Sequence, residues 1–553
     1  MIFVDANNQK RKIGQGQFYV TADNPKLWAP INVSDYFSQN NGIVISSDKT
    51  NFTIKTDSFG TLPVTYNLKH NFFSHSLVDG RHPDFLCSEN IDLTAFWEAI
   101  LFDYPLGVRT LNKNIIHVPG GASLEIDVQS RVFNTARWQF FNYNTDAVSQ
   151  VNEHVARIDD RLTEIAKKCW SNLSQDQSIL LPLSGGLDSR LLAAHFAKQG
   201  DPKRIIAVTF AYSPHSYEYK IAESVCRILG INQHFFYKLD GYHYSKCIKD
   251  FWEKTSGNLS VLHSHLYAFI KTKNLSRHLL VTGFYSDPIS GYAATSVNET
   301  DIKNSNVYKK IINEIARLKI PLDIEDNILA DLRVLHEDWL NNNDVIGFDE
   351  FLYLSQKQAK IFSNLIHIYR SCINVCAPFS DPCLIKLFLS LPYNLRKEKK
   401  IIRLLLSDAN NGLSSVPDVS SSVDKSSLRS KFYAEKRRFS TRIQMMSNIL
   451  TCDQYTWVSP YTTEDVFGSM RKESFSEIQK ICNKLRDLEI ISEFQCEVFK
   501  KKAMSSKDAA MQARILSFLD FGNANPSFTL GSFSLRLSRH LPGPNTKRFV
   551  NVR

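Results

Sequence analysis

The fold is decided by the stretch Leu181-Pro182-Leu183-Ser184-Gly185-Gly186-Leu187-Asp188-Ser189-Arg190. The residues before it, 179–181, are short and apolar and predict a buried strand, whereas the apolar run 191–196 predicts a helix that begins close to Asp188. Gly185 and Gly186 allow the backbone to approach a ligand closely, and the first amides of the helix have no partners within it. Together with the helix dipole, these amides predict an anion-binding turn.

The same turn carries polar side chains that suit a metal–phosphate ligand. Ser184 and Ser189 supply hydroxyls and Asp188 supplies a carboxylate, so a phosphate and a magnesium ion can be held together. The turn is not a Walker A loop, because the pattern G-x-x-x-x-G-K-[ST] is absent from the sequence. The alternative interpretation is a chance glycine turn between a strand and a helix.

The spelling S-G-G-x-D-S resembles the pyrophosphate-binding loop of the ATP pyrophosphatases. Within that group it is most similar to the family of asparagine synthetases, β-lactam synthetases and lasso-peptide cyclases. The resemblance implies ATP and Mg²⁺ as cofactors. The nucleotide-binding residues that it implies in this stretch are Leu183, Ser184, Gly185, Gly186, Asp188 and Ser189, with Asp188 also a metal ligand.

Length and composition set the class of protein. A chain of 553 residues is too long for one core and predicts two or three domains. A hydrophobic content of 43% and a charged content of 22% are typical of a soluble globular protein, with neither a membrane-length apolar run nor a signal-peptide layout. The ten cysteines lack paired spacing, which favours reduced thiols, and we expect a cytoplasmic protein. The net charge of +10 is spread along the chain, so we expect no nucleic-acid partner and no membrane partner.

The first part of the chain, up to about residue 140, is predicted to be β-rich, with strands at 43–45 and 51–56. Residues 57–66 and 110–121 resemble two elements of the family's N-terminal domain, D-x-x-G-x-x-P-L-Y-Y and T-x-x-x-x-I-x-x-L-x-P-G. The resemblance implies that residues 1–145 form an Ntn-type β-sandwich-like domain of the class II glutamine amidotransferases.

The glutaminase chemistry of that domain is expected to be absent. It needs a thiol nucleophile whose own free α-amine acts as the base. The second residue is Ile2, and the first cysteine of the chain is Cys87. We therefore expect a degenerate domain with a structural or substrate-docking role.

The middle of the chain alternates strand and helix. After a predicted amphipathic helix at 151–169, strands are predicted at 204–210 and 232–237, on either side of a helix at 217–229. This alternation predicts an α/β fold, a doubly wound parallel sheet whose ligand lies at the carboxyl ends of the strands. We assign residues 150–405 to an ATP-binding synthetase domain.

Two side chains of this region carry separate expectations. The resemblance places Tyr212 on the adenine side of the nucleotide site. His234 matches a histidine common at that strand, and we expect it to be packed and hydrogen-bonded rather than catalytic.

A second motif, at 279–292, resembles L-S-G-E-G-S-D-E-x-x-G-G-Y of the family. The resemblance makes Asp287 a metal ligand and catalytic residue that shares magnesium with the loop aspartate, and it places Thr282 and Gly283 at the nucleotide. Phe284 and Pro288 stand where the family has glutamates. The loss of the first acid makes aspartate a doubtful substrate.

A third motif, at 376–403, contains C-A-P-F-S-D, which resembles R-x-P-F-L-D, and K-K-I-I-R, which resembles K-x-x-L-R. The resemblance makes Lys399 the catalytic lysine that touches the phosphates, with Lys400 close enough to compete for that role. The alternative is an ordinary basic start of a helix. Asn374 replaces the glutamate that β-lactam synthetases use in a base dyad.

Residues 406–553 carry no readable motif. A Ser- and Asp-rich loop at 408–427 precedes predicted helices at 431–446 and 474–499, so we expect a helical, basic C-terminal extension of the synthetase domain.

These patterns predict an asparagine synthase-like ligase that consumes ATP, releases AMP and pyrophosphate, and joins a carboxylate to an amine as an amide or lactam. The expected partners are a carboxylate-bearing small molecule, peptide or sugar and an amine or ammonia donor, and a dimer is allowed for. One alternative is an asparagine synthase-type amidotransferase that takes ammonia from solution or from a partner. Two others are a thiolase or nucleotide-modifying enzyme that acts on RNA and a non-catalytic nucleotide-binding accessory protein.

Overall fold

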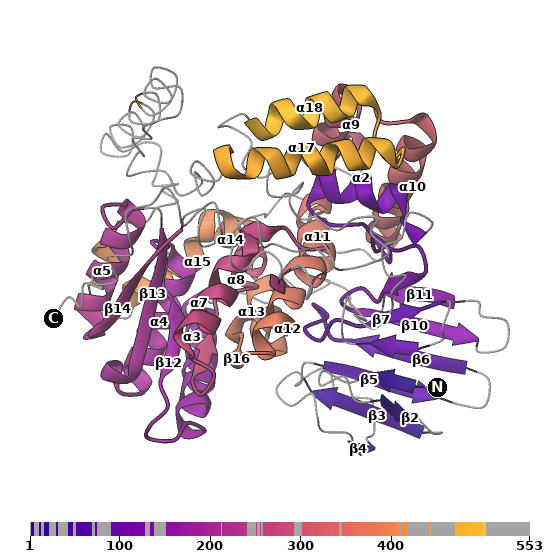
Figure 1. The fold of residues 1–553 in the computed structure, drawn as a ribbon. Coiled ribbons are helices and arrows are strands. Elements are labelled where there is room, and N and C mark those ends of the chain that lie inside the picture. The colour runs from indigo at the N-terminus through magenta and orange to yellow at the C-terminus, as the bar shows by residue number, and fades with distance from the viewer. Residues whose placement is uncertain are drawn as a thin grey trace.

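The computed structural model describes residues 2–4, 10–12, 16–21, 29–30, 42–47, 51–68, 72–74, 90–127, 133–137, 151–211, 213–239, 250–251, 255, 258–291, 301–341, 346–408, 412–417, 439, 443 and 471–504. One part of it is built on a five-stranded parallel sheet, seen at the left of Figure 1. The strand order is β14-β13-β12-β15-β16, and every neighbouring pair is parallel. The strands are β12 (Ile179–Pro182), β13 (Ile205–Ala211), β14 (Gln233–Lys238), β15 (Leu279–Val281) and β16 (Asn374–Cys376).

Burial explains why the inner strands are apolar. The first three residues of β12 and the first five of β13 are buried, as expected for strands that are covered on both faces. The predicted α/β fold with a parallel sheet is therefore confirmed, and the strand bounds differ from the predicted ones by a residue or two.

The order of the strands creates a switch point. The chain runs outward from β12 to β13 and β14 through α4 (Leu187–Gln199) and α5 (Tyr217–Leu229). It then returns through α7 (His265–Lys273) to β15, on the other side of β12. In such sheets a crevice opens at the carboxyl ends of the two strands where the direction reverses, here β12 and β15.

The caps of α5 show how its predicted bounds arise. The side chain of Ser216 accepts a hydrogen bond from the amide of Tyr219, and the helix ends at Gly230, whose φ of +70° is left-handed. The helix spans Tyr217–Leu229, as predicted.

The remaining elements of this part are mostly helical, and none of the described helices is long and apolar enough to span a membrane. The α-helices are α3 (Val151–Ser171), α8 (Ser286–Ile289), α9 (Asn306–Leu318), α10 (Leu322–Asn341), α11 (Phe348–Leu352), α12 (Asn364–Arg370), α13 (Pro382–Leu389), α14 (Tyr393–Arg396) and α15 (Lys400–Asp408). A π-helix, η5 (Tyr353–Ser363), joins α11 to α12. Short 3₁₀ turns are η2 (Pro202–Arg204), η3 (Val261–Ser264), η4 (Ile302–Asn304), η6 (Pro378–Ser380), η7 (Lys397–Lys399) and η8 (Leu413–Ser415).

The N-terminal part consists of two further sheets, with orders β2-β1-β8-β7-β9 and β11-β10-β6-β5-β3-β4. The second is antiparallel throughout, and the first has one parallel pair, β1 with β8. Buried side chains of both sheets form a shared core that includes Ile43, Ile54, Tyr66 and Ile116. The strands are β1 (Ile2–Val4), β2 (Lys10–Lys12), β3 (Gly16–Thr21), β4 (Ala29–Pro30), β5 (Gly42–Ser47), β6 (Asn51–Thr56), β7 (Thr65–Asn67), β8 (Phe72–Ser74), β9 (Ile115–His117), β10 (Ala122–Asp127) and β11 (Phe133–Arg137).

The predicted β-rich character of this part is confirmed. Its assignment as an Ntn-type, amidotransferase-like domain stays a prediction. The predicted boundary near residues 145–150 falls at a segment, 138–150, outside the described residues.

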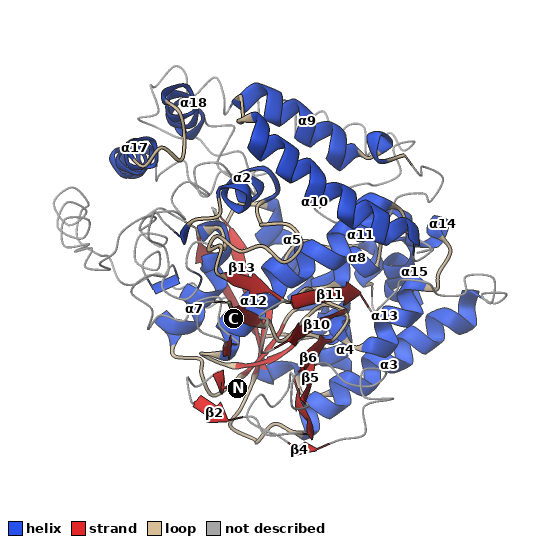
Figure 2. Ribbon diagram, turned by 90° about the vertical axis from the view of Figure 1, so that its right-hand side faces the viewer, coloured by secondary structure: helices blue, strands red, loops and turns tan. Residues whose placement is uncertain are grey.

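One N-terminal helix and two C-terminal helices pack together. Figures 1 and 2 show α2 (Leu93–Phe102) between α10 and the pair α17 (Arg471–Asp487) and α18 (Glu493–Met504). The rings of Trp97 and Phe499 lie 5.9 Å apart, so the C-terminal helices help to cover α2. The helix predicted at 474–499 is two helices, with the break at Glu489, whose φ is +57°. The helix predicted at 431–446 lies almost wholly outside the described residues.

Candidate active site

The S-G-G-L-D-S turn lies where predicted, between the end of β12 and the start of α4, and its two serines bridge it. The amide of Ser184 donates to Ser189 Oγ (3.1 Å), and the two hydroxyl oxygens are 2.9 Å apart. The amide of Gly186 donates to Ser184 Oγ (3.1 Å). These bonds fold the turn back on the first residues of α4, where amides lack helical partners.

One backbone amide of the turn already donates a hydrogen bond to a carboxylate. The amide of Gly185 donates to Glu218 Oε1 (3.3 Å), on the first turn of α5. Burial raises the pKa of Glu218, and this hydrogen bond opposes the rise. A negatively charged oxygen can therefore be accepted at this amide, as phosphate binding requires. The sequence pattern does not mark Glu218 as a site residue, because its position beside the turn depends on how α5 packs.

The other two motifs meet the turn at a single ammonium group. Lys399 Nζ donates to Asp188 Oδ2 and to Asp287 Oδ1. Ser286 Oγ donates to the other oxygen of Asp188. Gly283 faces the same place, since a Cβ built on it would lie 3.9 Å from Asp188 Cβ and 3.9 Å from the amide nitrogen of Ser189. Residues more than 200 positions apart are thus brought together at the switch point.

The charges of this cluster favour a further cation. Burial raises the pKa of Asp188, while Lys399 lowers it and Asp287 raises it. Burial lowers the pKa of Lys399, but the two carboxylates outweigh that effect and the net shift is upward. One ammonium between two carboxylates leaves one negative charge in excess, and it shows that both carboxylates can turn toward the same cation.

The oxygen ligands of this cluster suit magnesium better than a metal ion whose ligands all come from the protein. Within the described parts of the chain, no three His, Cys, Asp or Glu side chains are grouped as metal ligands. Two carboxylates with a nearby hydroxyl suit Mg²⁺, which usually keeps several waters and binds substrate phosphates as well. Asp188 and Asp287 would hold it.

Lys399 lies in a turn whose backbone conformation is constrained. Glu398 (φ +59°) and Lys399 (φ +56°) both adopt the left-handed conformation, which is unfavourable for residues other than glycine. The preceding Arg396 is anchored by a buried ion pair with Glu350. Its backbone also lies so close to Gly291 that a Cβ there would be 2.3 Å from the Arg396 carbonyl oxygen. The helix α15 begins at Lys400, directly after this turn.

Arg190 ties the turn to a segment beyond the predicted domain end at residue 405. Its buried guanidinium donates to the carbonyls of Gly185 (3.4 Å), Val416 (2.7 Å) and Pro417 (2.6 Å). A buried arginine within an apolar helix is the signal that could have marked it, but the sequence does not show which carbonyls it meets.

The π-helix η5 reaches the cluster from another side and contacts α8. Burial lowers the pKa of Lys357, and the charge of Asp287 is near enough to oppose that effect. π-Helical segments frequently occur at functional sites, and the sequence pattern gives no indication of this one.

Two predicted nucleotide-binding residues make backbone hydrogen bonds beside the turn. Leu183 has a buried side chain, and its carbonyl accepts a hydrogen bond from Thr209 Oγ1 (2.6 Å). Thr282 is buried, and its amide donates to the carbonyl of Cys376 (3.0 Å), which joins the ends of β15 and β16. Tyr212 lies outside the described residues.

His234 is packed and hydrogen-bonded, as expected. Its ring stacks on Tyr219 with centroids 4.7 Å apart, and Nε2 lies 2.8 Å from Thr209 Oγ1. Because the Thr209 hydroxyl gives its proton to the Leu183 carbonyl, Nε2 of His234 is the donor in this pair. His234 therefore supports the residue that precedes the turn.

This geometry predicts a pH dependence of stability. Burial lowers the pKa of His234 to about 4, from an ordinary value of 6.5. Between these two values the unfolded chain binds a proton that the folded chain does not, so the unfolding free energy falls as the pH drops from 6.5 to 4, by up to about 3 kcal/mol. Denaturant unfolding at both pH values should show a smaller loss for His234→Gln. An equal loss in the variant and the wild type would contradict this assignment.

Phe284, one of the positions at which the chain departs from the family motif, lies in an aromatic group. Phe284 lies 5.0 Å from Phe362 and 6.1 Å from the buried Tyr369, measured between ring centroids. Asn374 is exposed at the first residue of β16. An aromatic side chain thus stands three residues before Asp287, where the resemblance implies an acid.

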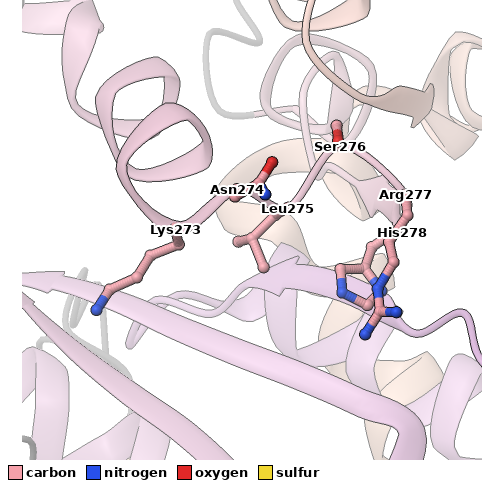
Figure 3. Close-up of a pocket in the computed structure, with 6 residues that line it drawn as sticks. All are labelled: Lys273, Asn274, Leu275, Ser276, Arg277 and His278. Atoms are coloured by element: carbon pink, nitrogen blue, oxygen red, sulfur yellow. The ribbon is translucent and has the colours of Figure 1, made fainter.

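A separate pocket of about 460 Å³ lies away from this cluster (Figure 3). It is formed by the segment between α7 and β15, with Lys273, Asn274, Leu275, Ser276, Arg277 and His278 as its lining. This segment precedes β15, so the pocket is at the amino end of that strand, opposite the end that carries Gly283 and Asp287. It is not the predicted nucleotide site.

Comparison with known proteins identifies the middle of the chain. Residues 158–263 match the family model described as asparagine synthase. This asparagine synthase segment contains the turn and Glu218, which confirms the family resemblance there. It ends before Asp287 and Lys399, so for those residues the resemblance stays a prediction.

Other comparisons add little. No curated protein matches the chain. Among solved structures, the chain is similar to an NH3-dependent NAD synthetase from Campylobacter jejuni subsp. jejuni NCTC 11168 in complex with the nitrate ion, with 18% identity over 34% of this chain and 86% of that one. The TM-score is 0.19. The asparagine synthase segment supports an ATP-dependent, amide-forming ligase family.

Proposed function

We propose that this protein is a ligase that uses ATP to adenylate a carboxylate and then joins the acyl group to an amine, as an amide or a lactam. One observation carries the proposal. Asp188, Asp287 and Lys399 come from three separate motifs and meet beside the S-G-G-L-D-S turn, at the switch point of a parallel sheet.

Each group has a distinct part in binding ATP. The amides and hydroxyls of the turn, from Ser184 to Ser189, would hold the pyrophosphate portion, with Glu218 yielding the Gly185 amide to a phosphate oxygen. Magnesium held by Asp188 and Asp287 would supply charge neutralisation at the phosphates. Lys399, released from the carboxylates, would offset the negative charge that develops on the α-phosphate.

The reaction balances without another reagent. A carboxylate oxygen of the substrate attacks the α-phosphorus, and the bond from that phosphorus to pyrophosphate breaks. The amine then attacks the acyl carbon, AMP leaves with its oxygen, and the amine loses a proton. Both steps place charged reactants in fixed positions, which can supply much of the rate enhancement.

The amine is proposed to come from a source other than this chain's own hydrolysis of glutamine. Residues 1–86 contain no cysteine. They therefore offer no thiol nucleophile of the kind that this glutaminase chemistry needs. The remaining sources of the amine are free ammonia, the product of a partner, and an amine within the substrate itself. The last source would give a lactam. Phe284, at the position of an acid in the family, disfavours aspartate as the carboxylate.

Pyrophosphate–ATP exchange tests this function directly. We expect no exchange with ATP and Mg²⁺ alone, and exchange when the correct class of acid is added from a panel of amino acids, peptides with free side-chain carboxylates and sugar acids. Glutamine should be neither consumed nor required. ATP binding without exchange across the whole panel would favour an accessory protein instead, and release of ammonia from glutamine would contradict the proposed lack of glutaminase activity.

A further inference from the structure

The turn that carries Asp287 has an unusual backbone. Tyr285 directly precedes α8 and has a φ of +69°, which is left-handed for a bulky residue. Such a conformation persists only where the surroundings hold it. The next two residues are Ser286, bonded to Asp188, and Asp287, bonded to Lys399. The conformation of Tyr285 therefore sets the direction in which both side chains leave the chain.

An N-terminal residue holds Tyr285. The ring of Phe59 stacks on that of Tyr285 with centroids 4.9 Å apart and planes 3° from parallel. Both rings are buried. Ser363, at the end of the π-helix, joins the two: its hydroxyl donates to the carbonyl of Phe59 (2.8 Å), and Tyr285 Oη lies 2.8 Å from Ser363 Oγ. Since the Ser363 proton goes to Phe59, the Tyr285 hydroxyl is the donor to Ser363.

Phe59 is itself fixed by the turn in which it lies. The carboxylate of Asp57 accepts hydrogen bonds from the amides of Phe59 (3.1 Å) and Thr61 (3.0 Å) and from the Thr61 hydroxyl (2.6 Å). Gly120 packs so closely that a Cβ on it would be 2.6 Å from the Phe59 carbonyl carbon. The ring that supports Tyr285 is thus presented by a rigid N-terminal turn, not by a free loop.

We propose that Phe59 is a positioning residue for the nucleotide site. It holds Tyr285 in the left-handed conformation and so keeps Ser286 and Asp287 directed at Asp188 and Lys399. The N-terminal sheets would then have a function that needs no glutaminase: they complete the site through this contact. The consequence for nucleotide binding rests on the proposed function, whereas the consequence for the turn itself does not.

The test compares Phe59→Leu with the wild-type protein in two measurements. The first is hydrogen exchange without nucleotide at the amides of Ser286 and Ser290, which donate to Gly283 (3.2 Å) and Ser286 (2.8 Å). We expect faster exchange at both amides in the variant. The second is the calorimetric Kd for ATP with Mg²⁺, which should rise roughly three- to tenfold, the range expected for loss of one aromatic pair.

Two further variants separate positioning from general damage. Gln356→Leu removes a contact of the same π-helix with the N-terminal part, the hydrogen bond from the amide of Gly107 (2.9 Å), which does not involve Tyr285. It should leave both measurements unchanged, even if it lowers the Tm. Tyr285→Phe keeps the stacked ring and should change the Kd less than Phe59→Leu does.

The outcomes decide between the ideas. If Phe59→Leu leaves exchange at Ser286 and Ser290 unaltered, or if Gln356→Leu has an equal effect on it, the positioning role is wrong. If hydrogen exchange at these two amides becomes faster but the Kd for ATP does not rise, Phe59 supports the turn without affecting nucleotide binding. The proposal then also fails. If the wild-type protein binds no ATP but hydrogen exchange at these amides is faster in Phe59→Leu, the proposed function is wrong. The support of Tyr285 by Phe59 then stands.

Discussion

Replacement of Asp188 by asparagine should lower the rate of pyrophosphate–ATP exchange by at least about 100-fold, which is the scale on which charge-stabilising groups act in enzymes. Asp188 is the point at which the three motifs meet, since Lys399 and Ser286 each donate to one of its oxygens. An amide of the same shape keeps the packing but removes the charge that magnesium needs. The affinity for ATP should become nearly independent of magnesium, and calorimetry with and without the metal measures this.

The stability of Asp188→Asn separates a functional carboxylate from a structural one. Burial raises the pKa of Asp188, and Asp287 raises it further, so the folded protein disfavours this charge despite Lys399. We therefore expect the Tm to stay the same or to rise while exchange is lost, as is typical of residues kept for activity. The matched control is Asp176→Asn. Asp176 is exposed and lies just before the amino end of β12, so this variant should change neither the Tm nor the rate of pyrophosphate–ATP exchange. Unaltered exchange in Asp188→Asn would remove the basis of the site.

Local patterns were sufficient for the strand–turn–helix around Ser184 because its elements are short and adjacent. The apolar run into β12, the glycine pair and the capping of α5 by Ser216 each act within a few residues, so the elements form close to their predicted bounds. The meeting of Asp287 and Lys399 was expected only from the family resemblance. No periodicity in the sequence places residues 112 positions apart in contact, as the pair at Lys399 and Asp287 is.

What the sequence could not show depends on long-range packing. Arg190 bonds to carbonyls more than 220 residues away, and Glu218 reaches the Gly185 amide only because α5 packs beside the turn. The contact between Phe59 and Tyr285 joins parts of the chain that carry separate motifs. Both residues could be read as ordinary core aromatics, and only the left-handed φ of Tyr285, which has no signal in the sequence, points to a role.

Lys399→Met gives the second large effect, and it should separate binding from catalysis. The ammonium lies between Asp188 and Asp287, where its charge competes with a metal ion. Without it, the two carboxylates lose the ammonium group that contacts both of them, so the affinity for Mg²⁺ should increase and ATP should still bind. The rate of exchange should nevertheless fall roughly 100- to 1,000-fold, because the group that offsets charge on the α-phosphate is lost.

The neighbouring lysine provides the control for this prediction. Lys400 is exposed at the first position of α15, whereas Lys399 points into the cluster from a left-handed turn that Arg396 anchors to Glu350. Lys400→Met should therefore retain exchange within about twofold, as surface substitutions usually do. If Lys400→Met loses exchange and Lys399→Met keeps it, the catalytic role belongs to Lys400. If neither variant loses exchange, the basic pair is only the start of a helix, since a lysine that stabilised the transition state could not be removed without a cost in rate.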